Sequence, residues 1–228
     1  MEINRYIDHA VLKPEMTQEE VREAIKEGID LEVNTVCVRA CDIDLAVSMC
    51  KGTKTRAGCV LDFPYGHGGK EAKAALAEIY AKQGVDEIDM VMNYSLARSG
   101  EWDRVEDEIS AVVKAAHKYN VIVKVIFETS MLNIEQIKKA TEVSIAANAD
   151  FVKTSTGFNG EGATVEGVKA MLEASAGRIK VKASGGIRDK TQAEMFINMG
   201  VSRLGIGYSS VRAICAGQKI EGSDTSVY

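Results

Sequence analysis

Proline and paired cysteines are scarce in this chain of 228 residues, and their scarcity excludes two classes of protein. Only two prolines are present, which argues against Pro-rich linkers and disordered segments. The five cysteines are odd in number and contain no Cys-x-x-Cys pair, so they do not indicate a disulfide framework. We interpret them as small buried apolar residues of a protein from a reducing compartment.

Excess positive charge and long apolar runs are also missing. The net charge is -5, which leaves no basic surface of the kind that binds nucleic acid or an anionic membrane. No stretch reaches the roughly 18 apolar residues that a membrane span needs, and the N-terminus lacks the apolar segment of a signal peptide. These absences predict a cytoplasmic protein whose partners are small molecules rather than nucleic acid or membrane.

Short β-rich runs alternate with longer segments of helical spacing along the chain. The predicted strands are residues 6–11, 34–38, 56–62, 87–92, 121–127, 150–154, 180–183 and 203–206. The first predicted helix opens with a capping box formed by Thr17 and Glu20. The other predicted helices occupy residues 42–51, 69–83, 101–119, 133–147, 164–175 and 190–199.

Strands separated by helices along the whole length favour a parallel sheet with right-handed crossovers. Eight near-regular units predict that this sheet closes as a TIM (β/α)8 barrel. An open, doubly wound sheet is the alternative. No linker or change in composition divides the chain, so we expect one domain over residues 1–228, with a flexible tail at residues 217–228.

One predicted strand carries a lysine where an apolar residue is expected. Residues alternate faces along a strand, so Lys153 shares a face with Phe151 and Ser155. A buried ammonium group is costly unless it is paired or loses its proton. The pattern therefore indicates a neutral, nucleophilic amine of the kind that forms a Schiff base with a carbonyl. A lysine that reaches out from a strand end, or a structural ion pair, is the alternative.

Ionisable residues interrupt other predicted strands as well. Lys182 stands in a setting similar to that of Lys153, and a second cation nearby would favour the neutral form of the first. Asp8, Asp89 and Lys124 interrupt three further strands. Side chains that point into a barrel near the carboxyl ends of its strands meet at one site, where opposite charges make burial tolerable. Each of these residues taken alone could instead be an ordinary surface or strand-edge charge.

Two glycine-rich turns follow the last two predicted strands. The first is residues 185–188, and the second is residues 205–210, which include Ser209 and Ser210. Barrel enzymes often bind phosphate at this position through backbone N–H groups at the start of a short helix. The two turns together predict a phosphorylated substrate.

Other short patterns do not indicate a metal or a nucleotide. The three histidines, His9, His67 and His117, lack the spacing of metal ligands, so we expect neither a metal nor another cofactor. The glycine-rich stretch at residues 66–70 lacks the spacing of a P-loop. We interpret it as a loop between a strand and a helix.

The chain resembles the deoxyribose-phosphate aldolases over nearly its whole length. The most specific segments are Lys-Thr-Ser-Thr-Gly at residues 153–157 and Lys-Ala-Ser-Gly-Gly at residues 182–186. Further matching segments are residues 7–9, 62–66, 87–91, 99–102, 124–129 and 162–164. The resemblance implies a TIM barrel, usually a homodimer, that needs no cofactor. Its implied reaction is the reversible cleavage of 2-deoxy-D-ribose 5-phosphate to D-glyceraldehyde 3-phosphate and acetaldehyde.

The resemblance also implies roles for particular residues. The implied catalytic group is Lys153 as the Schiff-base lysine, Lys182 as the lysine that perturbs it, Asp89 in a proton relay, and Lys124 and Asp8 in a supporting polar network. The implied phosphate site is Gly157, Gly185, Gly186, Gly207, Ser209 and Ser210. Tyr228, the last residue, matches a C-terminal tyrosine that some members use in proton transfer. Two positions depart from the family, because Ala10 stands where threonine is common and Tyr208 where a small residue is usual.

Two other functions fit parts of the pattern. A sugar-phosphate isomerase or epimerase on the same barrel would move a proton with a carboxylate or histidine base and would form no covalent adduct. A non-catalytic sugar-phosphate sensor would bind the ligand and release no product. The inward lysines favour the aldolase over both, because neither alternative needs an amine that reacts with aldehydes.

Overall fold

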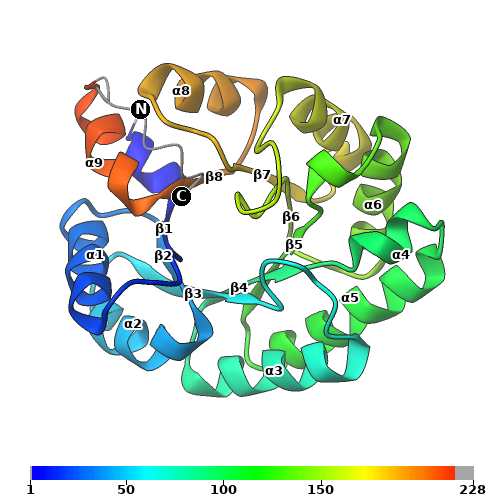
Figure 1. Cartoon of the computed structure of the whole chain (residues 1–228), viewed down its shortest axis with the longest axis horizontal. Helices are drawn as coiled ribbons and strands as arrows, with labels where there is room; N and C mark the ends of the chain where they lie inside the picture. The colour runs from blue at the N-terminus through cyan, green and yellow to red at the C-terminus, as the bar shows by residue number, and fades with distance from the viewer. Residues whose placement is uncertain (1, 219–228) are drawn as a thin grey trace.

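Eight parallel strands close into a barrel in the computed structural model, which describes residues 2–218 (Figure 1). The strands are β1 Ile7–Val11, β2 Thr35–Val38, β3 Arg56–Leu61, β4 Glu87–Val91, β5 Ile122–Ile126, β6 Phe151–Lys153, β7 Lys180–Ser184 and β8 Arg203–Gly207. Each strand pairs with the next along the chain, and β8 pairs with β1. The predicted TIM barrel is confirmed, and each predicted strand end lies within one residue of the observed end.

Helices form an outer ring around the strands (Figure 1). The α-helices are α1 Gln18–Asp30, α2 Ile43–Cys50, α3 Lys70–Gln83, α4 Tyr94–Arg98, α5 Trp102–His117, α6 Ile134–Ala146, α7 Val165–Ser175, α8 Lys190–Met199 and α9 Tyr208–Ala216. The 3-10 helices are η1 Ile3–Tyr6, η2 Ala40–Asp42 and η3 Thr129–Met131. The capping box at the start of α1 is present, with Thr17 and Glu20 each accepting a hydrogen bond from the other's backbone N–H.

Apolar side chains fill the space between strands and helices, whereas charged side chains occupy the inside of the barrel. In β1, the outward residues Ile7 and Val11 belong to the main apolar core together with Val21 and Ile25 of α1. Each such buried side chain contributes roughly 1.5–3 kcal/mol to folding. Asp8 lies between Ile7 and Val11 on the opposite face and is fully buried inside the barrel. The core outside the barrel thus stabilises the fold and leaves the interior available for polar groups.

Glycine is needed inside the barrel where a lysine requires space. A Cβ atom added to Gly205 would lie 2.5 Å from Cβ of Ser184 and 3.1 Å from Cε of Lys182. Only glycine leaves enough room at this position.

The turn predicted at residues 205–210 is wrong. Gly205 and Gly207 belong to β8, and the chain passes from Gly207 directly into α9. The sequence pattern does not reveal α9 because the two glycines resemble a turn. It also does not reveal α4, which has only five residues.

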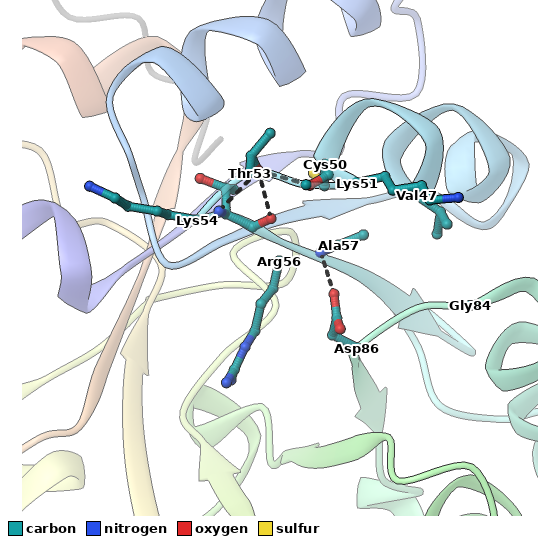
Figure 2. Close-up of a pocket in the computed structure, with 11 residues that line it drawn as sticks. Val47, Cys50, Lys51, Thr53, Lys54, Arg56, Ala57, Gly84 and Asp86 are labelled. Atoms are coloured by element: carbon teal, nitrogen blue, oxygen red, sulfur yellow. Dashed lines mark hydrogen bonds between the residues drawn. The ribbon is translucent and has the colours of Figure 1, made fainter.

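The two ends of the barrel have different roles. At the end where the strands begin, a pocket of about 400 Å³ is lined by the loop between α2 and β3 and by the starts of β3 and β4 (Figure 2). There the carboxylate of Asp86 accepts a hydrogen bond from the N–H of Ala57 at 2.9 Å. Arg56 pairs with Glu87 at 3.2 Å. These contacts stabilise the end of the barrel where the strands begin, which we call its floor. Barrel enzymes carry out their chemistry at the opposite end.

The structure also bears on the expected lack of a membrane span, on the cysteines and on the predicted tail. Within residues 2–218, no helix is long and apolar enough to cross a membrane. Of the cysteines, Cys37, Cys50 and Cys59 are buried as expected, but Cys41 is exposed, so the prediction of buried apolar residues is wrong for it. Cys41 lies in η2, outside the core-facing strands and helices. The expected tail at residues 217–228 lies almost entirely outside the described residues.

Candidate active site

Lysines and carboxylates from five strands meet inside the barrel. Nζ of Lys153, on β6, donates to Oδ2 of Asp89, on β4, at 2.9 Å. Lys182, on β7, donates to the same oxygen at 2.7 Å and to Asp8 on β1 at 2.5 Å. Lys124, on β5, donates to the other oxygen of Asp89 at 2.9 Å. All five side chains are buried. The alternative that each is an ordinary surface or strand-edge charge is therefore wrong.

Lys153 is the least compensated of the three lysines. Lys124 lies within 3.1 Å of three carboxylates, which belong to Glu87, Asp89 and Asp8. Within residues 2–218, Lys182 contacts two carboxylates, whereas Lys153 contacts only that of Asp89. Because a buried charge needs partners to offset its lost hydration, Lys153 is the lysine whose burial these carboxylates compensate least.

Basic side chains outnumber carboxylates in the buried part of this cluster. The buried carboxylates belong to Asp8, Glu87 and Asp89, and the buried basic side chains are Lys124, Lys153, Lys182 and Arg203. A low-dielectric interior favours equal numbers of opposite charges, so the carboxylates compensate the basic groups only in part.

The carboxylates of the cluster stay ionised. Burial alone would raise the pKa of Asp89, but Lys124, Lys153 and Lys182 outweigh it and hold the pKa of Asp89 well below its usual range. Burial acts on Asp8 in the same direction, and Lys124 and Lys182 overcome it and lower the pKa of Asp8 to about 2. Both groups are therefore anions that fix the positions of the amines.

The predicted phosphate residues follow three neighbouring strands. A Cβ atom added to Gly185, after β7, would lie 3.4 Å from Cα of Gly157, after β6, so the two glycines lie close together. The peptide N–H of Ala163 donates to the carbonyl of Gly185 at 3.0 Å, which fixes the loop after β6 against the turn after β7. The remaining members are Gly186 in the same turn, Gly207 as the N-cap of α9, and Ser209 and Ser210 in its first turn. The start of α9 supplies unpaired backbone N–H groups, which suit an anion.

The two departures from the aldolase pattern lie on β1 and at the start of α9. Ala10 is buried in a small apolar cluster inside the barrel, together with Cys37 and Val60. The ring of Tyr208 lies 6.5 Å from that of His9 and packs against the main core. Tyr228 lies outside the described residues, so its role stays a prediction.

Several known aldolases are similar to this chain. The DeoC/LacD family aldolase profile matches residues 3–217. The chain is 45% identical over 206 residues to a deoxyribose-phosphate aldolase of Caldanaerobacter subterraneus subsp. tengcongensis, covering 90% of this chain and 89% of that one. A deoxyribose-phosphate aldolase of Clostridium novyi is 44% identical over 221 residues, covering 97% and 98%.

The chain belongs to the DeoC/LacD aldolase family. The solved structure of a deoxyribose phosphate aldolase from Aeropyrum pernix superposes on it with a TM-score of 0.86 at 28% identity, over 94% of this chain and 89% of that one. The family predicted from the sequence is therefore confirmed. That solved structure is tetrameric, whereas the sequence resemblance implies a dimer, so the number of subunits in this aldolase stays a prediction.

The aldolase site contains two charged residues, Glu87 and Arg203, that were not predicted from the sequence. Glu87 accepts hydrogen bonds from Lys124 at 2.5 Å and from Thr35 at 3.0 Å, and Arg203 reaches Glu87 and Asp8 at 3.5 and 3.4 Å. Glu87 precedes Asp89 by two residues on β4, so strand alternation places both on one face and could have revealed it. Arg203 begins β8, where a charge resembles an ordinary strand end.

No metal centre is formed by the described part of the aldolase. Within residues 2–218, no group of three or more histidine, cysteine or acidic side chains is placed to hold a metal ion. His9 is buried between β1 and α1, and its Nε2 donates to the carbonyl of Ala24 at 2.9 Å. His117 contacts Asp150 at 2.9 Å at the molecular surface. The histidines thus lie apart from the lysine cluster.

His9 should make the stability of the aldolase depend on pH. Burial lowers the pKa of His9 to about 4, although the hydrogen bond to Ala24 opposes this. The unfolded chain, with a histidine pKa near 6.5, therefore binds more protons between these values, and stability falls as the pH falls. We expect His9 to reduce the free energy of unfolding by about 2 kcal/mol between pH 7 and pH 5.

Urea unfolding at the two pH values measures this effect. The matched variant is His9→Gln, which keeps an N–H donor for Ala24 but cannot take up a proton. His67 and His117 are present in both proteins, so their contributions cancel in the comparison. An equal loss of stability in both proteins would show that His9 is not responsible.

Proposed function

We propose that this aldolase reversibly cleaves 2-deoxy-D-ribose 5-phosphate to D-glyceraldehyde 3-phosphate and acetaldehyde through a Schiff base on Lys153. The observation that carries the proposal is the position of Lys153, which is buried, contacts one carboxylate among residues 2–218 and shares an oxygen of that carboxylate with Lys182. A neutral amine at this position is a nucleophile for an aldehyde. The names of the relatives support the same reaction.

The proposed reaction proceeds through an iminium ion, which accepts the electron pair of the broken C–C bond. Neutral Lys153 attacks the C1 aldehyde of the open-chain sugar, and loss of water gives an iminium ion. A base then removes the proton from the C3 hydroxyl group, and the C2–C3 bond breaks. Its electron pair forms an enamine on Lys153, and C3 becomes the aldehyde of glyceraldehyde 3-phosphate. Protonation of the enamine carbon and hydrolysis of the imine release acetaldehyde and restore the amine.

We assign the proton relay to Asp89, acting through a water molecule. Asp89 is a weak base while cations surround it. The positive charge on the iminium nitrogen disappears in the same step that releases the C3 proton, because the enamine is neutral. Asp89 therefore gains basicity when the proton must be accepted. General acid–base assistance of this kind contributes about 10² to 10⁴-fold to a rate.

The phosphate group of the substrate fits the loops after β6, β7 and β8. In the proposed site, Gly157, Gly185 and the first turn of α9 supply backbone N–H groups to the phosphate. Backbone N–H groups at the start of a helix attract a phosphate dianion. The proposed orientation places the sugar aldehyde at Lys153 and the phosphate at these loops. A homodimer, as the resemblance implies, and a cytoplasmic location, as the sequence predicts, are part of the proposal.

A coupled assay for glyceraldehyde 3-phosphate tests the proposed reaction. Deoxyribose 5-phosphate should be cleaved at the same rate with and without a chelator. An isomerase or epimerase would convert the sugar phosphate without releasing acetaldehyde, and a sensor would bind it without turnover. Either result would contradict the proposal, and a rate abolished by the chelator would contradict its metal-independent chemistry.

A further inference from the structure

Glu128 has a backbone conformation and a degree of burial that the catalytic mechanism does not explain. It lies two residues beyond the end of β5, is fully buried, and has φ +57° and ψ +66°. Residues other than glycine rarely adopt this left-handed conformation, because it brings Cβ too close to a backbone carbonyl oxygen. A glutamate retained in it must be held by its surroundings.

The carboxylate of Glu128 is held by the loop that follows the strand of Lys153. Its Oε1 accepts a hydrogen bond from the backbone N–H of Thr156 at 3.2 Å. Its Oε2 accepts one from the hydroxyl group of Thr156 and another from the side-chain amide of Asn159 at 3.2 Å. All three donors belong to the loop between β6 and α7, so one buried carboxylate fixes the start of this loop.

Asn159 extends the same connection to a third loop. Its side-chain amide also donates to the carbonyl of Pro64 at 3.0 Å, in the loop after β3. Burial raises the pKa of Glu128, whereas the bonds from Thr156 and Asn159 and the nearby charge of Lys153 oppose that change. Glu128 and Asn159 thus join the loops that follow β3, β5 and β6.

The residue after Thr156 is Gly157, which lies so near Gly185 that a Cβ atom added to Gly185 would be 3.4 Å from the Cα atom of Gly157. Further along the same loop, Gly162 packs so tightly on Gly185 that an added Cβ atom would lie 2.2 Å from its carbonyl oxygen. The loop therefore packs on the turn after β7, to which Ala163 also donates a hydrogen bond, and its start is fixed by Glu128. A displacement of Thr156 would be passed directly to Gly157.

We propose that Glu128 is a positioning residue for the phosphate end of the substrate. By holding Thr156, it places Gly157 against Gly185 so that backbone N–H groups of the two loops face a phosphomonoester dianion. This inference rests on the proposed function and adds to it a residue that contacts neither the phosphate nor the reacting carbon atoms. Glu128 connects the strand of Lys124 to the loop after the strand of Lys153.

Two substrates separate a positioning role from a merely structural one. Deoxyribose 5-phosphate has the phosphate group and 2-deoxyribose lacks it, but both present the same aldehyde to Lys153. Glu128→Gln keeps the size of the side chain and replaces one acceptor oxygen with an amide group that cannot accept. We expect the KM for deoxyribose 5-phosphate to rise about tenfold or more, the scale of one lost hydrogen bond to a charged group. We expect kcat/KM for 2-deoxyribose to change less than about threefold.

Three further variants sharpen the test. Thr156→Val removes the hydroxyl donor and should show the same selective rise in the KM for deoxyribose 5-phosphate. Thr156→Ser keeps the donor and should have a KM close to that of the wild type. These two variants also test the proposal if Glu128→Gln does not fold. Glu135→Gln changes an exposed glutamate of α6 and should leave both substrates unaffected.

Two outcomes would overturn the inference. Equal losses for both substrates would show that Glu128 only stabilises the fold, and no loss for either would show that it has no role in the site. A wild-type protein that does not cleave deoxyribose 5-phosphate would contradict the proposed function itself. That failure is recognised before any variant is measured, so the two failures are distinguishable.

Discussion

Replacing Lys153 with leucine should abolish carbon–carbon cleavage and leave the barrel folded. Leucine has no amine, so no iminium ion can form, and the rate should fall by a factor on the order of 10⁶, the scale for removing a covalent nucleophile. The fold should tolerate the change because Asp89 still accepts hydrogen bonds from Lys124 at 2.9 Å and from Lys182 at 2.7 Å. The substitution also removes one basic group from a buried cluster in which basic groups outnumber carboxylates.

The coupled assay for glyceraldehyde 3-phosphate measures this loss, and circular dichroism shows whether the barrel is intact. The matched control is Lys51→Leu, which changes an exposed lysine at the floor of the barrel and should leave the rate unchanged. A folded Lys153→Leu variant that retains more than about one hundredth of the wild-type rate would contradict the assignment of Lys153, because a nucleophile loss is far larger.

Replacing Asp89 with asparagine should separate imine formation from cleavage. The variant keeps the shape of the side chain but cannot accept a proton in the relay, so cleavage should fall about 10² to 10⁴-fold. Lys153 loses its one carboxylate contact, which favours the neutral amine, so imine formation with acetaldehyde should persist. Lys182 keeps Asp8 at 2.5 Å, and Lys124 keeps Glu87 at 2.5 Å.

The same variant should also be less stable. Removing one partner from a buried ion-pair cluster costs about 3–5 kcal/mol, which urea unfolding can measure. The matched control is Glu87→Gln, because Glu87 contacts Lys124 but not Lys153. This control should lose stability while its cleavage rate falls much less than that of Asp89→Asn. Equal losses of cleavage in the two variants would show that the carboxylates act only through the stability of the cluster.

The barrel itself was predictable because the physical signals are local. Strands with apolar runs and helices with an apolar face alternate along the chain, and each signal lies within a short window of sequence. The inward lysines and aspartates were predictable for the same reason, since strand alternation assigns Asp8, Lys124 and Lys153 to a face without knowledge of their partners. The pairing of Lys153 with Asp89 then follows from the closed barrel.

The remaining features depend on contacts between distant parts of the chain. Gly205 resembles a turn residue in the sequence, and only the position of Lys182 shows that it makes room for a side chain. Glu128 follows a strand without a local pattern that marks its importance, and its partners lie 28 and 31 residues away. Arg203 is inconspicuous at a strand end until Glu87 and Asp8 are placed beside it.

Borohydride trapping tests the central role of Lys153 most directly. The protein is incubated with acetaldehyde, reduced with borohydride, digested and analysed by peptide mass spectrometry, with Lys153→Leu as the negative control. We predict one added ethyl group on the peptide that contains Lys153, and none at Lys124 or Lys182. An unmodified Lys153 peptide, or a label that persists in Lys153→Leu, would contradict the Schiff-base mechanism.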